Sequence, residues 1–491
     1  MREMEHLKSL IIQDPVLKIL ANQATRLQKR AYLVGGYVRD SLLGLTPKDA
    51  DLMFEGEGLS ETLGNFIAEK FGSTLVRFEK HMVVYRITVQ DRQYDIADLH
   101  DQTMTDDQLR RDFTINSLAV EIGSLVQNPN PGGESLLDAS TGMLDLRDRI
   151  IRINSESVLN DDPLRIVRMF RFKTQLGFDI DSQSLEMASK YVNQLHKISG
   201  ERVRDELFQI LNRPRSAETL LQMDSIGVLS KLFPTIDEMR GVTQNEYHHL
   251  DVFDHTMDSI RQIEDVILFD LPVFQQYREE LLEHIHSEIV PGRKFSALMK
   301  LALLFHDIAK PRTREVRNDG KVTFINHNKR AVDMIDPDLE YLRLSRKERM
   351  YINMMVEGHL RPGFLNPDSP TLSRAIFRYF DQYDDWGVDL VVMSVADRLA
   401  AQGEKVDDDL NERHDKTTAI LLDAYYNRNK VLVRPPDLIN GDDLMVELNL
   451  PPGREIGILL RIVKEAQAAG EVNTKEDAIS YARSFFEVNS Q

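Results

Sequence analysis

The spacing of apolar residues changes near residue 31 and again near residue 150. Residues 1–30 have apolar side chains at helical spacing. From Tyr32 the apolar runs become short and β-like, in "AYLVGG", "DADLMF" and "HMVVYRITVQDRQYDIADL", the last with a turn near Gln90–Arg92. Between them, "ETLGNFIAEKFG" is expected to be a helix closed by Gly72. Residues 31–150 are therefore expected to form a small α/β unit.

The remainder of the chain has helical periodicity. Helices are expected from Ser157 to about Leu232 and from Val242 to about Lys430. The proline pair in "VRPPDLING" predicts a boundary, followed by a tail that ends in an amphipathic helix. The expected fold class is α+β and mostly helical. Its expected segments are an N-terminal helix (1–30), an α/β domain (31–150), two helical domains (151–235 and 236–430) and a helical tail (431–491).

The composition limits the kinds of metal site, cellular location and partner that are expected for this protein. The 491 residues include no cysteine, which excludes disulfides and thiolate metal sites. No apolar run is long enough for a membrane span and the N-terminus lacks a signal-type core, so a cytoplasmic protein without a membrane partner is expected. The net charge of −18 argues against a nucleic-acid partner. Basic clusters at 147–173 and 343–349 weaken that argument, because a global charge hides local patches.

Two aspartates flank one alanine where "DADLMF" begins. In a strand Asp49 and Asp51 project from the same face. Their like charges repel, and a divalent cation held between them would remove the conflict. Hard oxygen ligands favour Mg²⁺, which is usually completed by substrate phosphates. For these two residues alone, a solvated turn without metal is the alternative.

Neighbouring residues favour the metal and phosphate interpretation. Gly35 and Gly36 are expected to let backbone N–H groups approach a triphosphate. The following "YVRDSLLG" is expected to be a helix whose N-terminus faces that anion, with Arg39 one turn in. Asp95, on a strand that could run beside the first, would complete the trio needed for two-metal phosphoryl transfer. Asp98 is the competing candidate, but it lies on the opposite face from Asp95.

These residues resemble a known family. "GGYVRDSLLG…KDAD" is similar to the signature of class II tRNA nucleotidyltransferases, the CCA-adding enzymes, and of the related bacterial poly(A) polymerases. "RRDFTINSLAV", "DDPLRIVRMFRF" and "GERVRDELFQIL" follow in the family's order. The resemblance covers essentially the whole chain. It implies a DNA polymerase β-like nucleotidyltransferase domain over 31–150 and a helical nucleotide-recognition and RNA-binding domain over 151–235.

The resemblance also implies roles for individual residues. Asp49, Asp51 and Asp95 would be catalytic, with Mg²⁺ on Asp49 and Asp51. Asp162 and Arg165 would read the base edge of CTP or ATP. The other implied nucleotide-binding residues are Gly35, Gly36, Arg39, Arg111, Asp112, Asn116, Arg168 and Arg171. The arginines at 165, 168 and 171 recur between two apolar series, which favours a cleft-facing stripe over the alternative, a surface row of salt bridges.

A second group of residues lies in the helical middle. The order His…His-Asp…Asp resembles the HD superfamily of metal-dependent phosphohydrolases, which implies an HD domain over 236–430. The implied metal ligands are His255, His306, Asp307 and Asp397, with His327 and His359 available for a second position and a transition metal as the bound ion. Each histidine taken singly is expected to be an ordinary core or surface residue. An HD fold can also keep its ligands and serve as a scaffold for RNA.

The leading functional hypothesis is a template-independent enzyme that extends the 3′ end of tRNA with CTP or ATP. One alternative is a poly(A) polymerase of the same family, although its usual basic C-terminal extension is replaced here by a mixed, acidic tail. Another is an HD phosphohydrolase with a vestigial first domain, against which the intact "KDAD" and "RRDFTIN" argue.

One departure from the family pattern bears on nucleotide choice. Enzymes that add all of CCA carry a flexible basic loop before the "RRD" motif, whereas only "DQTMTDDQL" precedes Arg110 here. Relatives with this deletion add two cytidines and leave the adenosine to a partner enzyme. The resemblance therefore implies a CC-adding enzyme with an A-adding partner, and full CCA addition stays open as the alternative.

Overall fold

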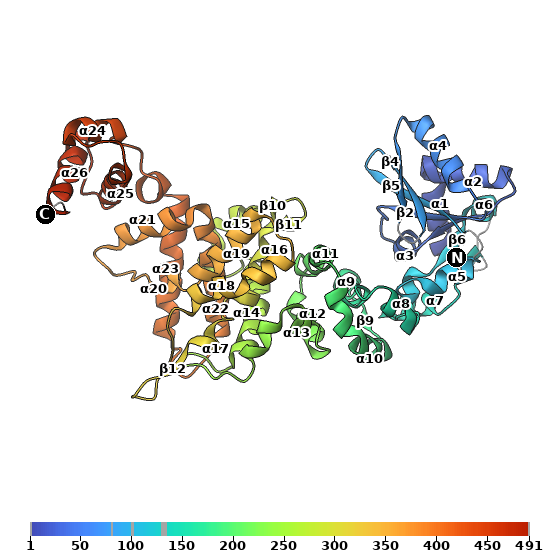
Figure 1. The fold of residues 1–491 in the computed structure, drawn as a ribbon, viewed down its shortest axis with the longest axis horizontal. Helices are drawn as coiled ribbons and strands as arrows, with labels where there is room; N and C mark the ends of the chain where they lie inside the picture. The colour runs from blue at the N-terminus through green and yellow to red at the C-terminus, as the bar shows by residue number, and fades with distance from the viewer. Residues whose placement is uncertain (1, 80–81, 100–102, 129–134, 490–491) are drawn as a thin grey trace. The chain divides into compact units, whose positions relative to one another are not determined.

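The computed structural model describes residues 2–79, 82–99, 103–128 and 135–489. The chain forms two compact units, Met1–Ile198 with Ile226–Lys231 and Ser199–Ser225 with Leu232–Gln491. The first contains a seven-stranded sheet and the second is mainly helical, which confirms the α+β, mostly helical fold class (Figure 1). None of the helices in the described ranges combines the length and apolar character needed to cross a bilayer.

The sheet of the first unit is mixed. Its strand order is β3-β4-β5-β2-β1-β6-β7, with β2 and β5 parallel and the other neighbours antiparallel. The runs expected as strands form strands because every second side chain enters the core, as Leu52, Phe54 and Ile96 do. The strands are β1 (Ala31–Val34), β2 (Ala50–Phe54), β3 (Leu75–Glu79), β4 (Val83–Val89), β5 (Arg92–Asp98), β6 (Ala119–Glu121) and β7 (Leu136–Leu137).

Short helices connect these strands. α3 (Gly36–Leu42) follows β1, and α4 (Leu59–Phe71) packs against β4 and β5. α4 ends at Gly72 in the left-handed conformation, as the sequence predicts. The turn between β4 and β5 is also where it is expected, and Gln90 adopts a positive φ of 55° there.

The N-terminal segment forms two helices, where the sequence analysis expects one. α1 (Arg2–Gln13) and α2 (Pro15–Arg26) are separated at Asp14. The Asp14 carboxylate accepts hydrogen bonds from the N–H groups of Val16 and Leu17, both at 2.9 Å. An aspartate cap followed by proline at the first helical position is a strong start signal, so α2 begins anew here.

Short helices complete the first unit. The bounds are α5 (Met104–Arg110), α6 (Ile122–Gln127), α7 (Gly142–Asp148), α8 (Glu156–Asp161), α9 (Arg165–Leu176) and α10 (Ser182–Tyr191), with a 3₁₀ turn η1 (Thr114–Asn116). β8 (Ile150–Ile151) and β9 (Asp179–Ile180) form a separate parallel pair. The helical character expected from Ser157 onward is confirmed.

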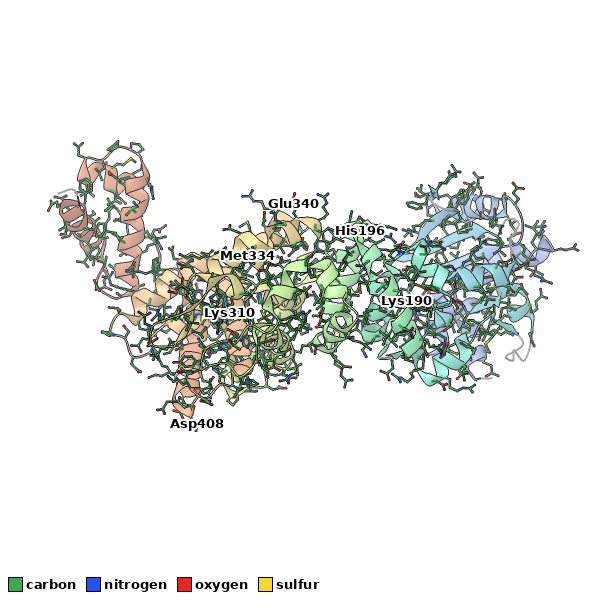
Figure 2. The ribbon with its side chains drawn as sticks, turned by 60° about the horizontal axis from the view of Figure 1, so that its bottom comes forward. Lys190, His196, Lys310, Met334, Glu340 and Asp408 are labelled. Atoms are coloured by element: carbon green, nitrogen blue, oxygen red, sulfur yellow. The ribbon has the colours of Figure 1, made fainter. Side chains whose placement is uncertain are left out.

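The second unit is organised around a buried helix, α16 (Phe295–Phe305), whose eleven residues are all buried. α14 (Val252–Val266) packs against both α16 and α22 (Gly387–Ala400). Around them lie α11 (Gly200–Leu211), α12 (Ser216–Ser225), α15 (Arg278–His286), α18 (His327–Tyr341), α19 (Arg346–Gly358), α21 (Leu372–Tyr383) and α23 (Asp408–Tyr426). Met334 and Glu340 mark α18 in Figure 2, and Asp408 marks the start of α23.

The C-terminal segment has its own small core. α24 (Gly441–Leu448), α25 (Arg454–Ala468) and α26 (Lys475–Asn489) surround a cluster that includes Leu444, Leu459 and Val463. The segment expected as a tail with one amphipathic helix is thus a packed group of three helices.

Candidate active site

Three carboxylates gather where β2 begins. β2 and β5 are parallel, and Asp51 lies directly opposite Asp95 in their register. Asp49 immediately precedes β2, on the same side as Asp51. The trio expected from the sequence is therefore brought together on neighbouring strands. Asp98 lies elsewhere: it is buried and accepts hydrogen bonds from the N–H groups of Gly58 and Ser60, both at 2.8 Å, at the start of α4.

An arginine that sequence reasoning missed orients one member of the trio. Arg86, opposite Asp95 on β4, donates from Nε and Nη2 to the two Asp95 oxygens, both at 2.7 Å. A two-pronged pair of this kind fixes the plane of the carboxylate. The only sequence signal is a charged residue within the otherwise apolar run "VVYRITV".

The trio is crowded electrostatically. Asp51 is exposed on one side yet packed against protein atoms on the other, and this burial raises its pKa. Arg111 opposes the shift, while Asp95 and Asp49 add to it. A set of three hard oxygen donors that repel one another fits a divalent cation such as Mg²⁺, because a bound cation would stabilise the charged forms.

Gly35 is needed for close approach. Its φ is 72°, and a Cβ added there would lie 3.0 Å from Arg111 Nη1 and 3.5 Å from Asp51 Oδ2. Its N–H donates to the Leu118 carbonyl at 3.1 Å, so that N–H is already engaged in the protein. That Gly35 and Gly36 let backbone N–H groups approach a triphosphate stays a prediction, and the Gly35 N–H itself is engaged with Leu118 in this structure. What Gly35 provides is the space that brings Arg111 beside Asp51, and Gly36 begins α3 next to it.

Buried polar side chains connect this glycine turn to α9. Arg39 Nη1 donates to Asn116 Oδ1 at 2.6 Å, and Asn116 Nδ2 donates to Asp112 Oδ1 at 3.0 Å. Arg168 completes the series with two bonds to Asp112 Oδ2, at 3.0 and 2.9 Å. Burial would raise the pKa of Asp112, but Arg168 and Asn116 outweigh it and lower the pKa. These four predicted nucleotide-binding residues thus hold one another in place.

The arginines of α9 are all half-buried. The guanidiniums of Arg39, Arg168 and Arg171 lie 5.0, 5.7 and 3.9 Å from the centre of the Phe172 ring. Arg165 Nη1 donates to the Arg110 carbonyl at 3.1 Å, and Asp162 precedes it by one turn. The predicted base readers thus lie side by side at the start of α9.

The second unit brings together all six residues of the histidine-bearing group. His255 comes from α14, His306 and Asp307 follow α16, His327 begins α18, His359 follows α19 and Asp397 is on α22. They form two possible metal-holding triads that share Asp307: His255, His306 and Asp307, and Asp307, His327 and His359. Asp397 Oδ1 lies 2.9 Å from His255 Nε2 and 3.4 Å from His306 Nε2.

Ring orientation in this cluster suits metal binding. The Nδ1 atoms of His306, His327 and His359 each lie 2.7–2.8 Å from a backbone carbonyl, of Leu303, Phe324 and Val356. If Nδ1 carries the proton, Nε2 presents a lone pair to the centre, the usual arrangement for a histidine ligand. Burial lowers the pKa of His359 to about 3, aided by His306 and His327. For His306, Asp307 and Asp397 outweigh the effect of burial and raise the pKa to about 10.

A cavity of about 410 Å³ opens onto this cluster. His327, His359 and Asp397 lie on its wall together with Lys310 and Arg398. Lys310, labelled in Figure 2, also lies 2.6 Å from Asp307 Oδ2 through its Nζ. Sequence reasoning did not single out these two cations, although Lys310 falls within the same "HDIAK" run.

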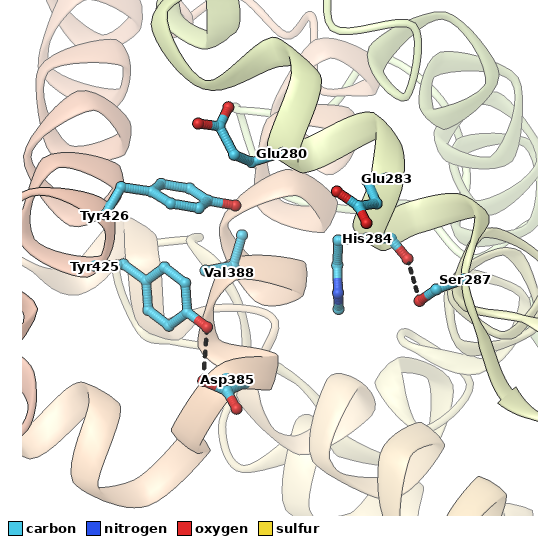
Figure 3. Close-up of a pocket in the computed structure, with 8 residues that line it drawn as sticks. All are labelled: Glu280, Glu283, His284, Ser287, Asp385, Val388, Tyr425 and Tyr426. Carbon is cyan, nitrogen blue, oxygen red and sulfur yellow. Dashed lines mark hydrogen bonds between the residues drawn. The ribbon is translucent and has the colours of Figure 1, made fainter.

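A separate cavity of about 350 Å³ lies in the second unit between α15, α22 and α23 (Figure 3). His284, on its wall, donates from Nε2 to the buried Asp389 at 2.9 Å. The rings of Tyr425 and Tyr426 and the carboxylates of Glu280 and Asp385 line it further. The sequence analysis did not identify the pair of His284 and Asp389, because the two residues are far apart in sequence and belong to no motif.

The fold and the carboxylate site of the first unit define a metal-dependent nucleotidyltransferase. Family models agree: residues 31–152 match the poly(A) polymerase head domain, residues 177–240 match the model described as "Probable RNA and SrmB- binding site of polymerase A", and residues 404–482 match domain 2 of tRNA nucleotidyltransferases.

Similar proteins agree as well. The chain is 29% identical over 464 residues to the A-adding tRNA nucleotidyltransferase of Deinococcus radiodurans, covering 93% of this chain and 96% of that protein. It is 27% identical over 480 residues to the CC-adding tRNA nucleotidyltransferase of Geobacter sulfurreducens, covering 97% of each. A solved CCA-adding enzyme with ATP shares the fold at a TM-score of 0.65 and 18% identity, over 98% of this chain and 96% of that one. The chain belongs to the family of class II tRNA nucleotidyltransferases and related poly(A) polymerases.

Proposed function

We propose that this tRNA nucleotidyltransferase is a CC-adding enzyme, which transfers two CMP units from CTP to a tRNA and leaves the final adenosine to a partner A-adding enzyme. The observation that carries the proposal is the connection before Arg111. There Thr103 caps the seven-residue helix α5 in a capping box with Asp106. Asp101 and Gln102, also part of that connection, lie outside the described residues. Arg111 Nε donates to Asp107 of this helix at 2.8 Å, so the helix is tied to the site.

A short, capped helix in this place favours a single nucleotide specificity. A flexible loop could reposition the base-reading side chains after the second cytidine, whereas α5 is joined to Arg111 by an ion pair and to Arg165 through the Arg110 carbonyl. Asp162 and Arg165 are then expected to stay set for cytosine, because nothing in α5 offers a second arrangement. Relatives named CC-adding from Geobacter sulfurreducens and Thermus thermophilus match nearly the whole chain, but so does the A-adding relative from Deinococcus radiodurans, so the choice of subtype rests on α5.

The residues suggest how transfer would proceed. Asp49, Asp51 and Asp95 would hold Mg²⁺, which supplies charge neutralisation for the attacking and leaving oxygens. Arg86 keeps Asp95 in the required plane, and Arg111 would lie along the triphosphate beside Gly35. The 3′-hydroxyl oxygen of the tRNA bonds to the α-phosphorus while the bond to the bridging oxygen breaks. Pyrophosphate leaves, and the hydroxyl proton passes to solvent.

The test of the subtype uses a tRNA that already ends in CC, supplied with ATP alone. The proposal predicts no appreciable extension of this RNA. It also predicts two additions when CTP is supplied to the same tRNA lacking both cytidines. Efficient addition of adenosine would exclude the CC-only specificity and favour either full CCA addition or the A-adding type.

A second candidate function is metal-dependent phosphoester hydrolysis in the second unit. The supporting observation is the shared aspartate: Asp307 lies 3.2 Å from His306 through Oδ2 and 3.2 Å from His327 through Oδ1. Asp307 and these histidines would hold transition-metal ions, which would supply an activated water for attack on a phosphoester. With Ni²⁺, Mn²⁺ or Co²⁺ supplied, the protein is expected to release phosphate from phosphomonoesters or open cyclic phosphodiesters, and Asp307→Ala is expected to lose this activity. No hydrolysis across such a panel would leave the cluster a structural feature.

A further inference from the structure

Two amide side chains that belong to none of the family motifs hold α5 in the first unit. The helix is only seven residues long, and its capping box lies at its first turn. A helix of this length has little stability of its own in water. Contacts with the rest of the unit must therefore keep α5 folded and in place.

The first anchor is Gln108, on the inner side of α5. Its side chain is 2% exposed, and Nε2 donates to the Ser117 carbonyl and to the Leu137 carbonyl, both at 2.7 Å. Ser117 follows the turn η1 and Leu137 belongs to β7, so one amide group joins α5 to two other parts of the unit. Both hydrogens of this amide are used, which fixes the direction of the side chain.

The second anchor is Asn154, which lies just after β8. Its Nδ2 donates to the Arg111 carbonyl at 2.9 Å, and the Gln108 carbonyl and Ser117 Oγ lie 3.3 and 2.5 Å from the same nitrogen. The Asn154 N–H donates to the Asp112 carbonyl at 3.2 Å. The last carbonyls of a helix have no partner within the helix, and Asn154 supplies one at the end of α5.

These anchors bear on the reaction because α5 leads directly into the site. Arg110, its last residue, accepts a hydrogen bond from Arg165 Nη1 through its carbonyl at 3.1 Å. Arg111, the next residue, lies beside Gly35 and Asp51. If α5 moved, the guanidinium expected to read the base and the one expected along the triphosphate would both lose their positions.

We infer that Gln108 and Asn154 are positioning residues for nucleotide choice. By holding α5 against the start of α9, they keep Arg165 in the one arrangement that favours cytosine, and a second arrangement that would admit adenine is not reached. Both act through α5 rather than on the reacting atoms. The inference rests on the proposed function, because it names the side chains that make α5 rigid in a CC-adding enzyme.

The nucleotide preference of two variants tests this assignment. Gln108→Met removes both donors of the first anchor at similar size, and Asn154→Ala removes the contact at the helix end. The measured quantity is the ratio of kcat/KM for CTP to kcat/KM for ATP, at the first addition to an RNA minihelix that lacks CCA. In each variant this ratio is expected to fall about 10-fold, the size expected from one or two lost hydrogen bonds. An unchanged ratio in either variant would overturn the inference.

Asp98→Ala is the matched control, because it removes a helix cap of the same unit away from α5. It is expected to lower the melting temperature and to leave the ratio of CTP to ATP use unchanged. A fall in the ratio as large as in the other two variants would show that lower stability alone alters nucleotide choice, and would overturn the inference.

Hydrogen exchange of the full-length wild-type protein gives an independent readout that requires no variant to fold. The amides of residues 107–111 are expected to exchange roughly 100-fold more slowly than those of an unstructured peptide, because α5 is anchored at both amide side chains. Exchange of these amides at peptide rates would overturn the inference. A wild-type protein that adds no CMP, or that adds adenosine after two cytidines, would instead overturn the proposed function, so the two failures are distinguishable.

Discussion

Asp51 and Asp98 lie in the same sheet of the first unit but differ in their surroundings and in their effect on stability. Asp51 is exposed beside two other carboxylates, and burial on its protein side together with its neighbours raises its pKa. Asp98 is buried and its oxygens are fully used as acceptors at the start of α4. The first arrangement costs stability and suits a bound cation, whereas the second stabilises a helix.

Asp51→Asn therefore separates function from stability. We expect it to abolish CMP incorporation, since a ligand of the catalytic cation is lost, and to leave the melting temperature equal or slightly higher, since a repelled charge is removed. Asp98→Ala is the contrasting variant. It is expected to lower the free energy of unfolding by about 1 kcal/mol through loss of the cap while retaining incorporation. Radiolabelled CTP incorporation and thermal melts measure both, and a normally active Asp51→Asn would contradict the metal assignment.

The pair His284–Asp389 gives a pH-dependent prediction. Burial would lower the pKa of His284, but the hydrogen bond and charge of Asp389 outweigh it and raise the pKa above 6.5. The protonated histidine thus stabilises the folded state below pH 6.5, and this contribution is lost as the pH rises through the folded-state pKa. We expect the melting temperature of wild type to fall relative to His284→Gln as the pH rises from 6 to 9. Parallel pH profiles of the two proteins would contradict the pairing.

At the scale of elements, periodicity predicts the positions of the three aspartates better than the residues that hold them in place. Alternation in "DADLMF" was enough to place Asp49 and Asp51 on one face, and the strand over 92–98 made Asp95 available. Which strand lies beside which cannot be read from periodicity, so the Arg86–Asp95 pair across β4 and β5 was missed. The division at Asp14–Pro15 did have a local signal, a cap followed by proline. The role of Gly35 depended on a tertiary contact with Arg111 and could not be predicted.

The ion pair between α9 and the turn at Asp112 is expected to determine the stability of the first unit. Arg168→Ala leaves Asp112 buried without its cation, and we expect a loss of roughly 2–3 kcal/mol in the free energy of unfolding. Adding Asp112→Asn should recover part of that loss, because the unpaired charge is then removed. Since the pair lowers the pKa of Asp112, the difference between wild type and Arg168→Ala should shrink as the pH falls below about 3.8. Urea denaturation measures all three proteins, and a double variant less stable than Arg168→Ala would contradict this account.

At the scale of the whole molecule, the two units each contain a candidate cation centre of different chemistry. The first offers carboxylate oxygens and the second mainly imidazole nitrogens, which suit Mg²⁺ and a transition metal respectively. The order of histidines and aspartates along the sequence predicted the membership of the second centre. The two oxygens of Asp307 face different triads, and Lys310 lies beside one of these oxygens. This arrangement depends on how five helices pack together, so the sequence could not predict it.

These chemistries predict independent metal loading. After exposure to Mn²⁺ or Ni²⁺ and desalting, elemental analysis is expected to find transition metal in wild type and in Asp51→Asn but much less in Asp307→Ala. CMP incorporation in Mg²⁺ is expected to be retained by Asp307→Ala. Equal transition-metal content in wild type and Asp307→Ala would contradict the second centre, and loss of incorporation would contradict its independence.

The most direct test of the central claim is the product formed from one tRNA that lacks its CCA end, incubated with the full-length protein, Mg²⁺ and all four nucleoside triphosphates. We predict that sequencing of the 3′ ends finds two added cytidines and no further nucleotide, and that Asp51→Asn leaves the tRNA unextended. A tRNA that gains a complete CCA end would contradict the CC-adding specificity. A tRNA that wild-type protein leaves unextended would contradict the nucleotide-transfer function itself.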